Sequence, residues 1–258
     1  HHHHDEHEHG IVHDHDHPHD NTTWSATHQA AHETLNHNPQ LNDAKTISVI
    51  KKILDKNNHE ASHNRAHFDK YKVLGINLMS SPGSGKTTLL ENLVDMVDFK
   101  FAVVEGDLET SRDADRLKAK GINAVQIQTG SACHLDAFMV HKGLHDIKLA
   151  DIDVCFVENV GNLVCPASYD VGTHLNIVLV SVPEGEDKIV KYPVMFRSAD
   201  LILFTKTDLL PYFEYDIEKE KMEARKLKPN VDILEVNVKD KQSLQNVIDW
   251  INFKRKMR

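Results

Sequence analysis

Seven short apolar segments, separated by stretches with helical periodicity, constrain the fold of this chain more than any other feature of its sequence. The segments cover residues 73–81, 100–108, 123–130, 153–161, 175–185, 199–210 and 231–238. Most are continuously apolar rather than alternating, which is typical of parallel strands covered by helices on both faces. Helical patterns occupy residues 87–97, 111–121, 135–145, 215–227 and 241–258. This alternation predicts an α/β fold with a doubly wound, mostly parallel sheet.

The first 39 residues differ sharply from the rest in composition. Of the 20 histidines in the chain, 16 precede Phe68, and residues 1–20 hold only His, acids and a few Gly, Ile, Val and Pro. Such a segment is too polar to bury a core, so we expect it to be disordered without a ligand. Apolar residues then recur on one side of a helix at Ile47, Val49, Ile50, Ile53 and Leu54. We therefore divide the chain into a His-rich tail and linker at 1–39 and one domain at 40–258, which opens with a helical extension.

Overall charge and cysteine content narrow the possible environments and partners. The formal net charge of −9 disfavours general binding to nucleic acid or an anionic membrane. No apolar run approaches the roughly 20 residues of a membrane span, and no secretory signal is recognisable. The three cysteines suit a reducing compartment. We expect a cytoplasmic protein.

A glycine-rich loop follows the first predicted strand and precedes a helix. Its sequence, SPGSGKTT at 81–88, matches the phosphate-binding pattern G-x-x-x-x-G-K-[ST], except that Ser80 stands at the first position. The two glycines let backbone N–H groups face phosphates, Lys86 reaches the β- and γ-phosphates, and Thr87 offers a hydroxyl to Mg²⁺. An ordinary glycine turn is the alternative, which the strand–loop–helix context disfavours. The predicted nucleotide-binding residues are Gly83, Ser84, Gly85, Lys86, Thr87 and Thr88.

The end of the sixth apolar segment suggests which base is bound. The residues Thr205-Lys206-Thr207-Asp208 resemble the N-K-x-D element of GTPases. A carboxylate at Asp208 accepts hydrogen bonds from the guanine edge, and the stem of Lys206 covers the base. Thr205 replaces the usual Asn, which leaves a solvated strand end, and with it ATP use, as the alternative.

Acidic residues follow two other strands. Glu105, Asp107, Asp113 and Asp115 come at or after the end of the second apolar segment, and Glu158 ends the fourth. Because strand ends converge on the nucleotide crevice of a doubly wound sheet, one acid is expected to hold Mg²⁺ and another to orient the attacking water. We favour such roles for Asp107, Asp113 and Glu158, and a solvated or capping role for Asp115.

Two cysteines and a histidine form a candidate site for a softer metal. Cys133 and His134 follow one strand, and Cys165 follows another at the same predicted sheet edge. Two thiolates and an imidazole suit Ni²⁺ or Zn²⁺ and leave a coordination position open or invite a second chain. Unpaired cysteines are more often buried as small apolar residues, and that alternative is the one we favour for Cys155.

Taken together, these motifs resemble one family. The segments SSPGSGKTTLLE, GDLETSRDADR, QTGSACHLDA, ENVGNLVCPA, VPEGEDKIVKYP and TKTDLLPY closely resemble the HypB hydrogenase nickel-incorporation GTPases, which belong to the SIMIBI class of P-loop NTPases. The resemblance covers roughly residues 40–255 in one order. It implies a homodimer that closes when GTP binds, with Cys133, His134 and Cys165 of both chains at the interface.

The resemblance also implies roles and partners. Asp113 resembles the catalytic acid, assisted by Lys86 and Glu158, while Asp107 and Glu158 are the magnesium and switch acids. A HypA-type nickel chaperone and the precursor of the hydrogenase large subunit are the implied partners. Because Cys165 lies four residues past Gly161, contacts with the γ-phosphate are expected to move the metal ligands.

We therefore predict a GTP-hydrolysing nickel metallochaperone that stores Ni²⁺ and inserts it during maturation of nickel–iron hydrogenase. Alternating imidazoles and carboxylates at 1–20, and further histidines up to position 37, favour a native nickel reservoir over a purification tag. Three alternatives remain. A urease-type accessory GTPase would carry Cys-Pro-His, whereas Ala167 follows Cys165-Pro166 here. The others are a protein chiefly for nickel storage and an ATP-dependent kinase, for which no acceptor site is evident.

Overall fold

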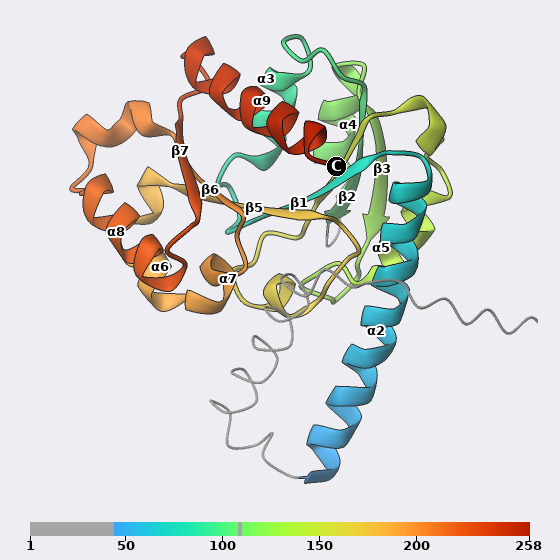
Figure 1. Ribbon diagram of the computed structural model, residues 1–258. Helices are drawn as coiled ribbons and strands as arrows, with labels where there is room; N and C mark the ends of the chain where they lie inside the picture. The colour runs from blue at the N-terminus through green and yellow to red at the C-terminus, as the bar shows by residue number, and fades with distance from the viewer. Residues whose placement is uncertain (1–43, 108–109) are drawn as a thin grey trace, which may run out of the picture.

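A single parallel sheet forms the centre of the domain. The computed structural model describes residues 44–107 and 110–258, so the tail and linker predicted at 1–39 lie outside the described residues (Figure 1). In the described part, seven strands pair in the order β3-β2-β4-β1-β5-β6-β7, all parallel. Each of the seven predicted apolar segments contains one strand, which confirms the doubly wound α/β fold. The strands are β1 Leu74–Ser80, β2 Phe101–Asp107, β3 Asn123–Gln128, β4 Val154–Glu158, β5 Leu175–Ser181, β6 Leu201–Thr205 and β7 Asp232–Val236.

Helices cover both faces of this sheet. The α-helices are α2 Ala44–Lys70, α3 Lys86–Leu93, α4 Arg112–Ala119, α5 Ala137–Leu144, α6 Lys188–Lys191, α7 Pro193–Arg197, α8 Ile217–Leu227 and α9 Lys241–Lys256. Short 3₁₀ turns are η2 Leu149–Asp151, η3 Cys165–Ser168, η4 Val182–Glu184 and η5 Thr207–Tyr212. Helices α3, α4 and α9 pack on one face, whereas α2 and α5 cover one half of the other face and α6–α8 its second half.

Burial on both faces explains why the strands read as continuous apolar runs. In β4, Val154 and Phe156 pack into the core under α3 and α9, whereas Cys155 and Val157 pack into the core under α2 and α5. Neighbouring side chains of a strand point to opposite faces, so most positions of a doubly covered strand are apolar. Cys155 is fully buried and lies in this core, as the sequence indicated.

Helix α2 departs most from a compact domain. Its C-terminal half is anchored, because Phe68 is buried and the Asn64 amide donates to the Ala137 and Val171 carbonyls at 2.9 and 3.1 Å. Its N-terminal half extends away from the body of the molecule (Figure 1). The apolar residues predicted to share one side there are therefore not covered, and Val49 and Ile53 are each 50% exposed.

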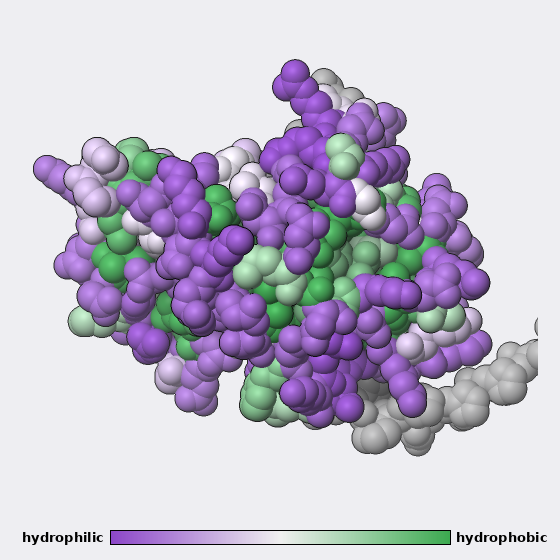
Figure 2. Space-filling model, turned by 90° about the horizontal axis from the view of Figure 1, so that it is seen from above, coloured by the Kyte–Doolittle hydropathy of each residue, from purple (hydrophilic) through white to green (hydrophobic). Residues whose placement is uncertain are grey.

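Seen from above, the surface is largely hydrophilic, with apolar side chains showing in separate patches (Figure 2). Among the described residues, no helix combines the length and the apolar character that crossing a bilayer requires.

Candidate functional site

The glycine-rich loop connects β1 to α3 at the centre of the sheet edge. Gly83 and Gly85 have φ angles of +76° and +103°, in the left-handed region where side chains cause strain. Lys86 begins α3, is only 8% exposed, and donates from Nζ to Ser80 Oγ at 2.8 Å. Burial lowers the pKa of Lys86, while the nearby charges of Glu158 and Asp113 act in the opposite direction. The loop therefore has the backbone and the buried cation that a phosphate site requires.

Three carboxylates converge beside this loop. Oxygens of Glu105, Asp113 and Glu158 lie within 4.8 Å of one another, and Thr87 Oγ1 donates to Glu158 Oε1 at 2.6 Å. Burial raises the pKa of Glu105 to about 8 and that of Glu158 to about 7, because the negative charge is poorly solvated there. One buried oxygen of each of these glutamates has no hydrogen-bond partner within the protein. Such unpartnered oxygens next to a threonine hydroxyl form a donor set that fits Mg²⁺.

The structure places the two acids at the end of β2 differently from the expectation. Glu105 lies directly opposite Glu158 in the ladder between β2 and β4. Asp107, the residue predicted to hold Mg²⁺, is not in the cluster of three, and its Oδ2 accepts from Thr110 Oγ1 at 2.8 Å. Its magnesium role stays a prediction. The sequence showed two acids at this strand end, and only the register between β2 and β4 distinguishes them.

The base element is tied to the glycine-rich loop. Thr205 Oγ1 donates to the Ser84 carbonyl and Lys206 Nζ donates to the Gly83 carbonyl, each at 2.7 Å. Thr205, the departure from the usual Asn, thus joins β6 to the phosphate loop. Asp208 lies in η5 with its Oδ2 3.2 Å from Lys239 Nζ.

Sequence reasoning missed the side chain that supports this loop. The Glu184 carboxylate accepts from Ser84 Oγ and from the backbone N–H of Ser181, both at 2.7 Å, and also from Ser81 Oγ. Glu184 and Ser181 form a capping box on η4. The S-x-x-E spacing of residues 181–184 carried this signal, but its contact with a loop 100 residues away did not follow from it.

The soft-metal candidates also come together. Ligand atoms of Cys133, His134 and Cys165 lie within 4.8 Å of one another, with Cys133 Sγ 3.9 Å from His134 Nδ1. Burial, reinforced by Cys133, raises the pKa of Cys165 to about 11, so a bound cation would be needed to hold the thiolate. Burial lowers the pKa of His134, which favours the neutral imidazole that binds metals. The set fits Ni²⁺ or Zn²⁺ and leaves a coordination position open.

Two asparagines after β4 hold the loops that carry these ligands. Asn159 Oδ1 accepts from the backbone N–H of Leu135, the residue after His134, at 3.0 Å. Asn162 Oδ1 accepts from the backbone N–H of Cys165, also at 3.0 Å. The sequence analysis assigned no role to either residue. Tyr169, equally missed, stacks on the His134 ring at 3.9 Å between centroids.

One loop contacts both sites. The backbone N–H of Asn162 donates to the Ser80 carbonyl at 2.8 Å, at the start of the phosphate loop. A Cβ atom on Gly161 would lie 2.8 Å from Pro82 Cα, so the two backbones touch. Residues 159–165 thus connect the phosphate loop to Cys165 without an intervening element. A change at the phosphates can therefore reach the thiol through direct contacts.

Comparison with known proteins places this geometry in a family. Residues 74–235 match the family model described as CobW/HypB/UreG, nucleotide-binding domain. A hydrogenase/urease maturation factor HypB of Helicobacter hepaticus is 51% identical over 230 residues, which cover 86% of this chain and 93% of that protein. The hydrogenase maturation factor HypB of Escherichia coli K12 is 44% identical, with 88% of this chain and 79% of that protein covered.

Solved structures agree. The crystal structure of HypB from Helicobacter pylori in complex with nickel matches with a TM-score of 0.77 and 47% identity, covering 78% of this chain and 96% of that one. The hydrogenase maturation factor HypB from Archaeoglobus fulgidus matches with a TM-score of 0.73 and 36% identity, covering 78% and 100%.

Proposed function

Because this chain belongs to the HypB family of nucleotide-binding maturation factors, we propose that it is a GTP-hydrolysing metallochaperone that inserts Ni²⁺ during maturation of nickel–iron hydrogenase. The observation that carries the proposal is the loop at 159–165, which contacts the phosphate loop at one end and bears Cys165 at the other. A nucleotide site and a soft-metal site joined in this way suit a protein whose nucleotide state controls the release of a metal.

The proposed nucleotide site acts mainly through electrostatic interactions. Lys86 neutralises charge on the β- and γ-phosphates, and the N–H groups of the glycine-rich loop hold their oxygens. Thr87 and Glu158, with Glu105 beside them, would hold Mg²⁺, which supplies positive charge for the leaving phosphate. Asp113, whose carboxylate lies beside those of Glu105 and Glu158, would orient the attacking water. Asp208 would exchange its ion pair with Lys239 for hydrogen bonds donated by guanine, and these bonds would make the site prefer GTP over ATP.

The proposed soft-metal site would be completed by ligands from a second chain. Cys133, His134 and Cys165 supply three ligands, and the same set from another copy would enclose the ion. Apolar side chains beside these ligands are exposed in the single chain, with Phe138 at 49% and Val164 at 53%. Covering them is a reason for a homodimer to close when GTP binds. A HypA-type chaperone would supply Ni²⁺, and the hydrogenase large-subunit precursor would receive it.

The decisive experiment measures nickel affinity in two nucleotide states. Ni²⁺ is titrated into the chain loaded with GDP or with a nonhydrolysable GTP analogue, in the presence of Mg²⁺. The Cys133→Ser/Cys165→Ser variant is the control. It lacks both thiols of this site, so the nickel that it still binds is held by histidines elsewhere in the chain. We expect a nucleotide-dependent difference that the double variant lacks. Equal affinities in both states would contradict the proposed coupling.

Urease is a second candidate recipient. The relatives from Helicobacter hepaticus and Helicobacter pylori are hydrogenase/urease maturation factors. We propose testing both recipients in one host that lacks its own HypB, by assaying hydrogenase and urease after this chain is supplied. Recovery of hydrogenase alone would restrict the function to that enzyme.

Nickel storage belongs to residues 1–39, which lie outside the described residues. We propose that this segment adds capacity rather than delivery. Deleting residues 1–38 should lower the number of Ni²⁺ ions bound per chain while maturation at ordinary nickel supply continues. Loss of maturation in that deletion would instead make the segment part of the delivery step.

A further inference from the structure

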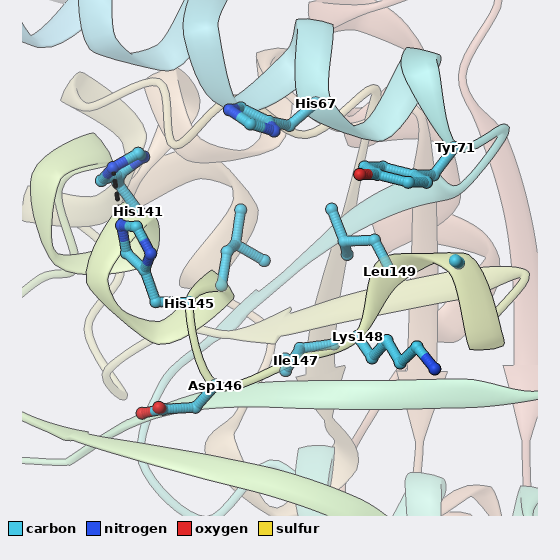
Figure 3. Close-up of a pocket in the computed structure, with 10 residues that line it drawn as sticks. His67, Tyr71, His141, His145, Asp146, Ile147, Lys148 and Leu149 are labelled. Atoms are coloured by element: carbon cyan, nitrogen blue, oxygen red, sulfur yellow. Dashed lines mark hydrogen bonds between the residues drawn. The ribbon is translucent and has the colours of Figure 1, made fainter.

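A second group of imidazoles lies away from the site already described, where α5 packs against α2. Here a groove of about 590 Å³ is bordered by His67 and Tyr71 at the C-terminal end of α2 and by His141 and His145 at the C-terminal end of α5. The two α5 rings stand together at one end of the groove, and the two α2 rings lie on its opposite wall (Figure 3). The function proposed above uses none of these residues.

The two α5 histidines have the spacing of metal ligands. His141 Nε2 and His145 Nε2 are 3.0 Å apart, and their ring centroids are separated by 4.7 Å. Two imidazole nitrogens bound at about 2.1 Å to one ion are about 3.0 Å apart when they subtend a right angle, and about 3.4 Å apart in a tetrahedron. The two nitrogens now share a hydrogen bond, and turning both rings would direct them at one ion with little change in their separation.

A carboxylate orients the first of these rings. Glu60 Oε1 on α2 lies 3.3 Å from His141 Nδ1, on the side of the ring opposite His145. A carboxylate at that distance favours the tautomer with the proton on Nδ1, which leaves the lone pair of Nε2 available to bind an ion. Metal-bound histidines almost always have such a partner on the second nitrogen, and its loss typically weakens metal binding.

One further imidazole borders the groove from α2, and one ammonium group lies on the groove wall. The His67 ring centroid is 6.3 Å from that of His141, across the groove. Lys148, on the wall of the groove, has its ammonium 3.6 Å from Asp151 Oδ2, so its charge is balanced. His67 is exposed at the groove wall, where a rotation of its side chain can supply a third nitrogen, and water can complete the coordination.

We propose that His141 and His145, oriented by Glu60 and joined by His67, bind one divalent transition-metal ion of the Ni²⁺, Cu²⁺ or Zn²⁺ class. Imidazole ligands favour these ions over Mg²⁺ and Ca²⁺. The site contains no thiol and does not touch the phosphate loop. This proposal does not depend on whether nucleotide controls metal binding by Cys133, His134 and Cys165. The helix α5, about 12 Å long, would then have a metal site near each end.

The test is made on the full chain with Ni²⁺ as the probe and a residue-resolved readout, because the tail histidines also bind the ion. Diethylpyrocarbonate modifies free imidazole nitrogens, and peptide mass spectrometry gives the modification rate of each histidine as Ni²⁺ is raised. We expect His141 and His145 to become protected together. His174 serves as an internal reference, because both its ring nitrogens already bond to Asp69 and to the backbone of Gly75.

Variants separate this site from the others. Glu60→Gln should raise the Ni²⁺ concentration needed for protection about 10- to 100-fold. The matched control Asp55→Asn, an exposed carboxylate on the same helix, should leave it unchanged. His141→Gln should abolish the protection of His145, with circular dichroism confirming that the variant is folded.

Two results would overturn the proposal. One is that His141 and His145 stay reactive until all nickel binding by the chain is saturated. The other is that Glu60→Gln and the wild type are protected at the same Ni²⁺ concentration. The Cys133→Ser/Cys165→Ser variant should keep the protection, so a failure of the proposed nucleotide-coupled site leaves this result unaffected.

Discussion

Two clusters of potential metal ligands lie at the same edge of the sheet and differ in almost every physical respect. The carboxylates of Glu105 and Glu158 are buried and are joined by a threonine hydroxyl and a buried lysine. The cluster of Cys133, His134 and Cys165 is only partly buried and leaves a coordination position open. Oxygen ligands in a closed pocket suit a hard ion held with a nucleotide, whereas thiols at the surface suit an ion that must be passed on. Ligand type and exposure therefore predict different roles for the two clusters.

The strongest test of this division removes the cation of the phosphate loop. Lys86→Ala should lower GTP hydrolysis about 10²- to 10³-fold, because its charge is directed at the transferring phosphate. Nickel affinity without nucleotide should be unchanged. Phosphate release and Ni²⁺ titration measure the two effects, with Lys118→Ala, an exposed lysine on α4, as the control. A parallel loss of nickel affinity would show that the clusters are not separable.

The reverse test removes a thiol. Cys165→Ser should weaken Ni²⁺ binding at this site by at least about 10²-fold, because a hydroxyl is a poor substitute for a thiolate. Hydrolysis of GTP in the absence of nickel should stay within about twofold of wild type, since Gly161 and Asn162 make the contacts of this loop with the phosphate loop. Cys155→Ala is the control, because that cysteine lies in the core. Equal nickel affinity in the wild type and Cys165→Ser would remove this thiol from the ligand set.

A smaller effect is expected when the loop that connects the two clusters is weakened. Asn162→Ala removes the side-chain oxygen that holds the backbone N–H of Cys165 but keeps the backbone bond to Ser80. The ratio of nickel affinities in the GTP-analogue and GDP states should fall about 5- to 10-fold, within the usual range of coupling energies. Titration calorimetry in both states gives the ratio, and Asn246→Ala on the exposed face of α9 is the control. An unchanged ratio would place the coupling elsewhere.

The smallest effect concerns how the free energy of unfolding depends on pH when Mg²⁺ and nucleotide are absent. Burial raises the pKa of Glu105 to about 8 and of Glu158 to about 7, above the ordinary value of 4.5. The folded state then binds more protons than the unfolded state between these values, so the contribution of these two groups to stability is complete below about pH 4.5 and is lost as the pH rises to about 8.

Glu105→Gln should flatten this dependence, since the amide does not ionise. The melting temperature should differ from wild type most at pH 8, by about 2–4 °C for each kcal/mol involved. Calorimetry at several pH values measures this, and Asp115→Asn, an exposed acid of α4, should retain the wild-type slope. The same slope in Glu105→Gln would mean that this carboxyl is not the titrating group.

Much of the fold followed from local patterns. Apolar runs predicted all seven strands, and the five inner strands are buried at nearly every position, whereas the edge strands β3 and β7 are partly exposed. Helix α2 was less predictable. Its apolar residues at 47–54 indicated a buried side, yet the anchoring contacts come from Asn64 and Phe68 further along the helix. Periodicity reports which residues share a side, and it does not report whether a neighbour covers that side.

The sequence by itself determined the chemistry that depends on neighbours in the chain. The glycine-rich loop with Lys86 and Thr87, the paired Cys133 and His134, and the thiol of Cys165 are all readable as ligand types at fixed spacings. Such motifs are short, so the backbone between their members leaves few arrangements.

Only the tertiary structure decided which distant groups meet. It paired Glu105 rather than Asp107 with Glu158, placed Glu184 against the phosphate loop, and brought His141 to Glu60. These choices depend on strand register and on the packing of loops and helices that are tens of residues apart. Glu105 and Asp107 share one face of β2, so a shift of two residues in register would exchange them opposite Glu158, and no local pattern in this chain records that choice.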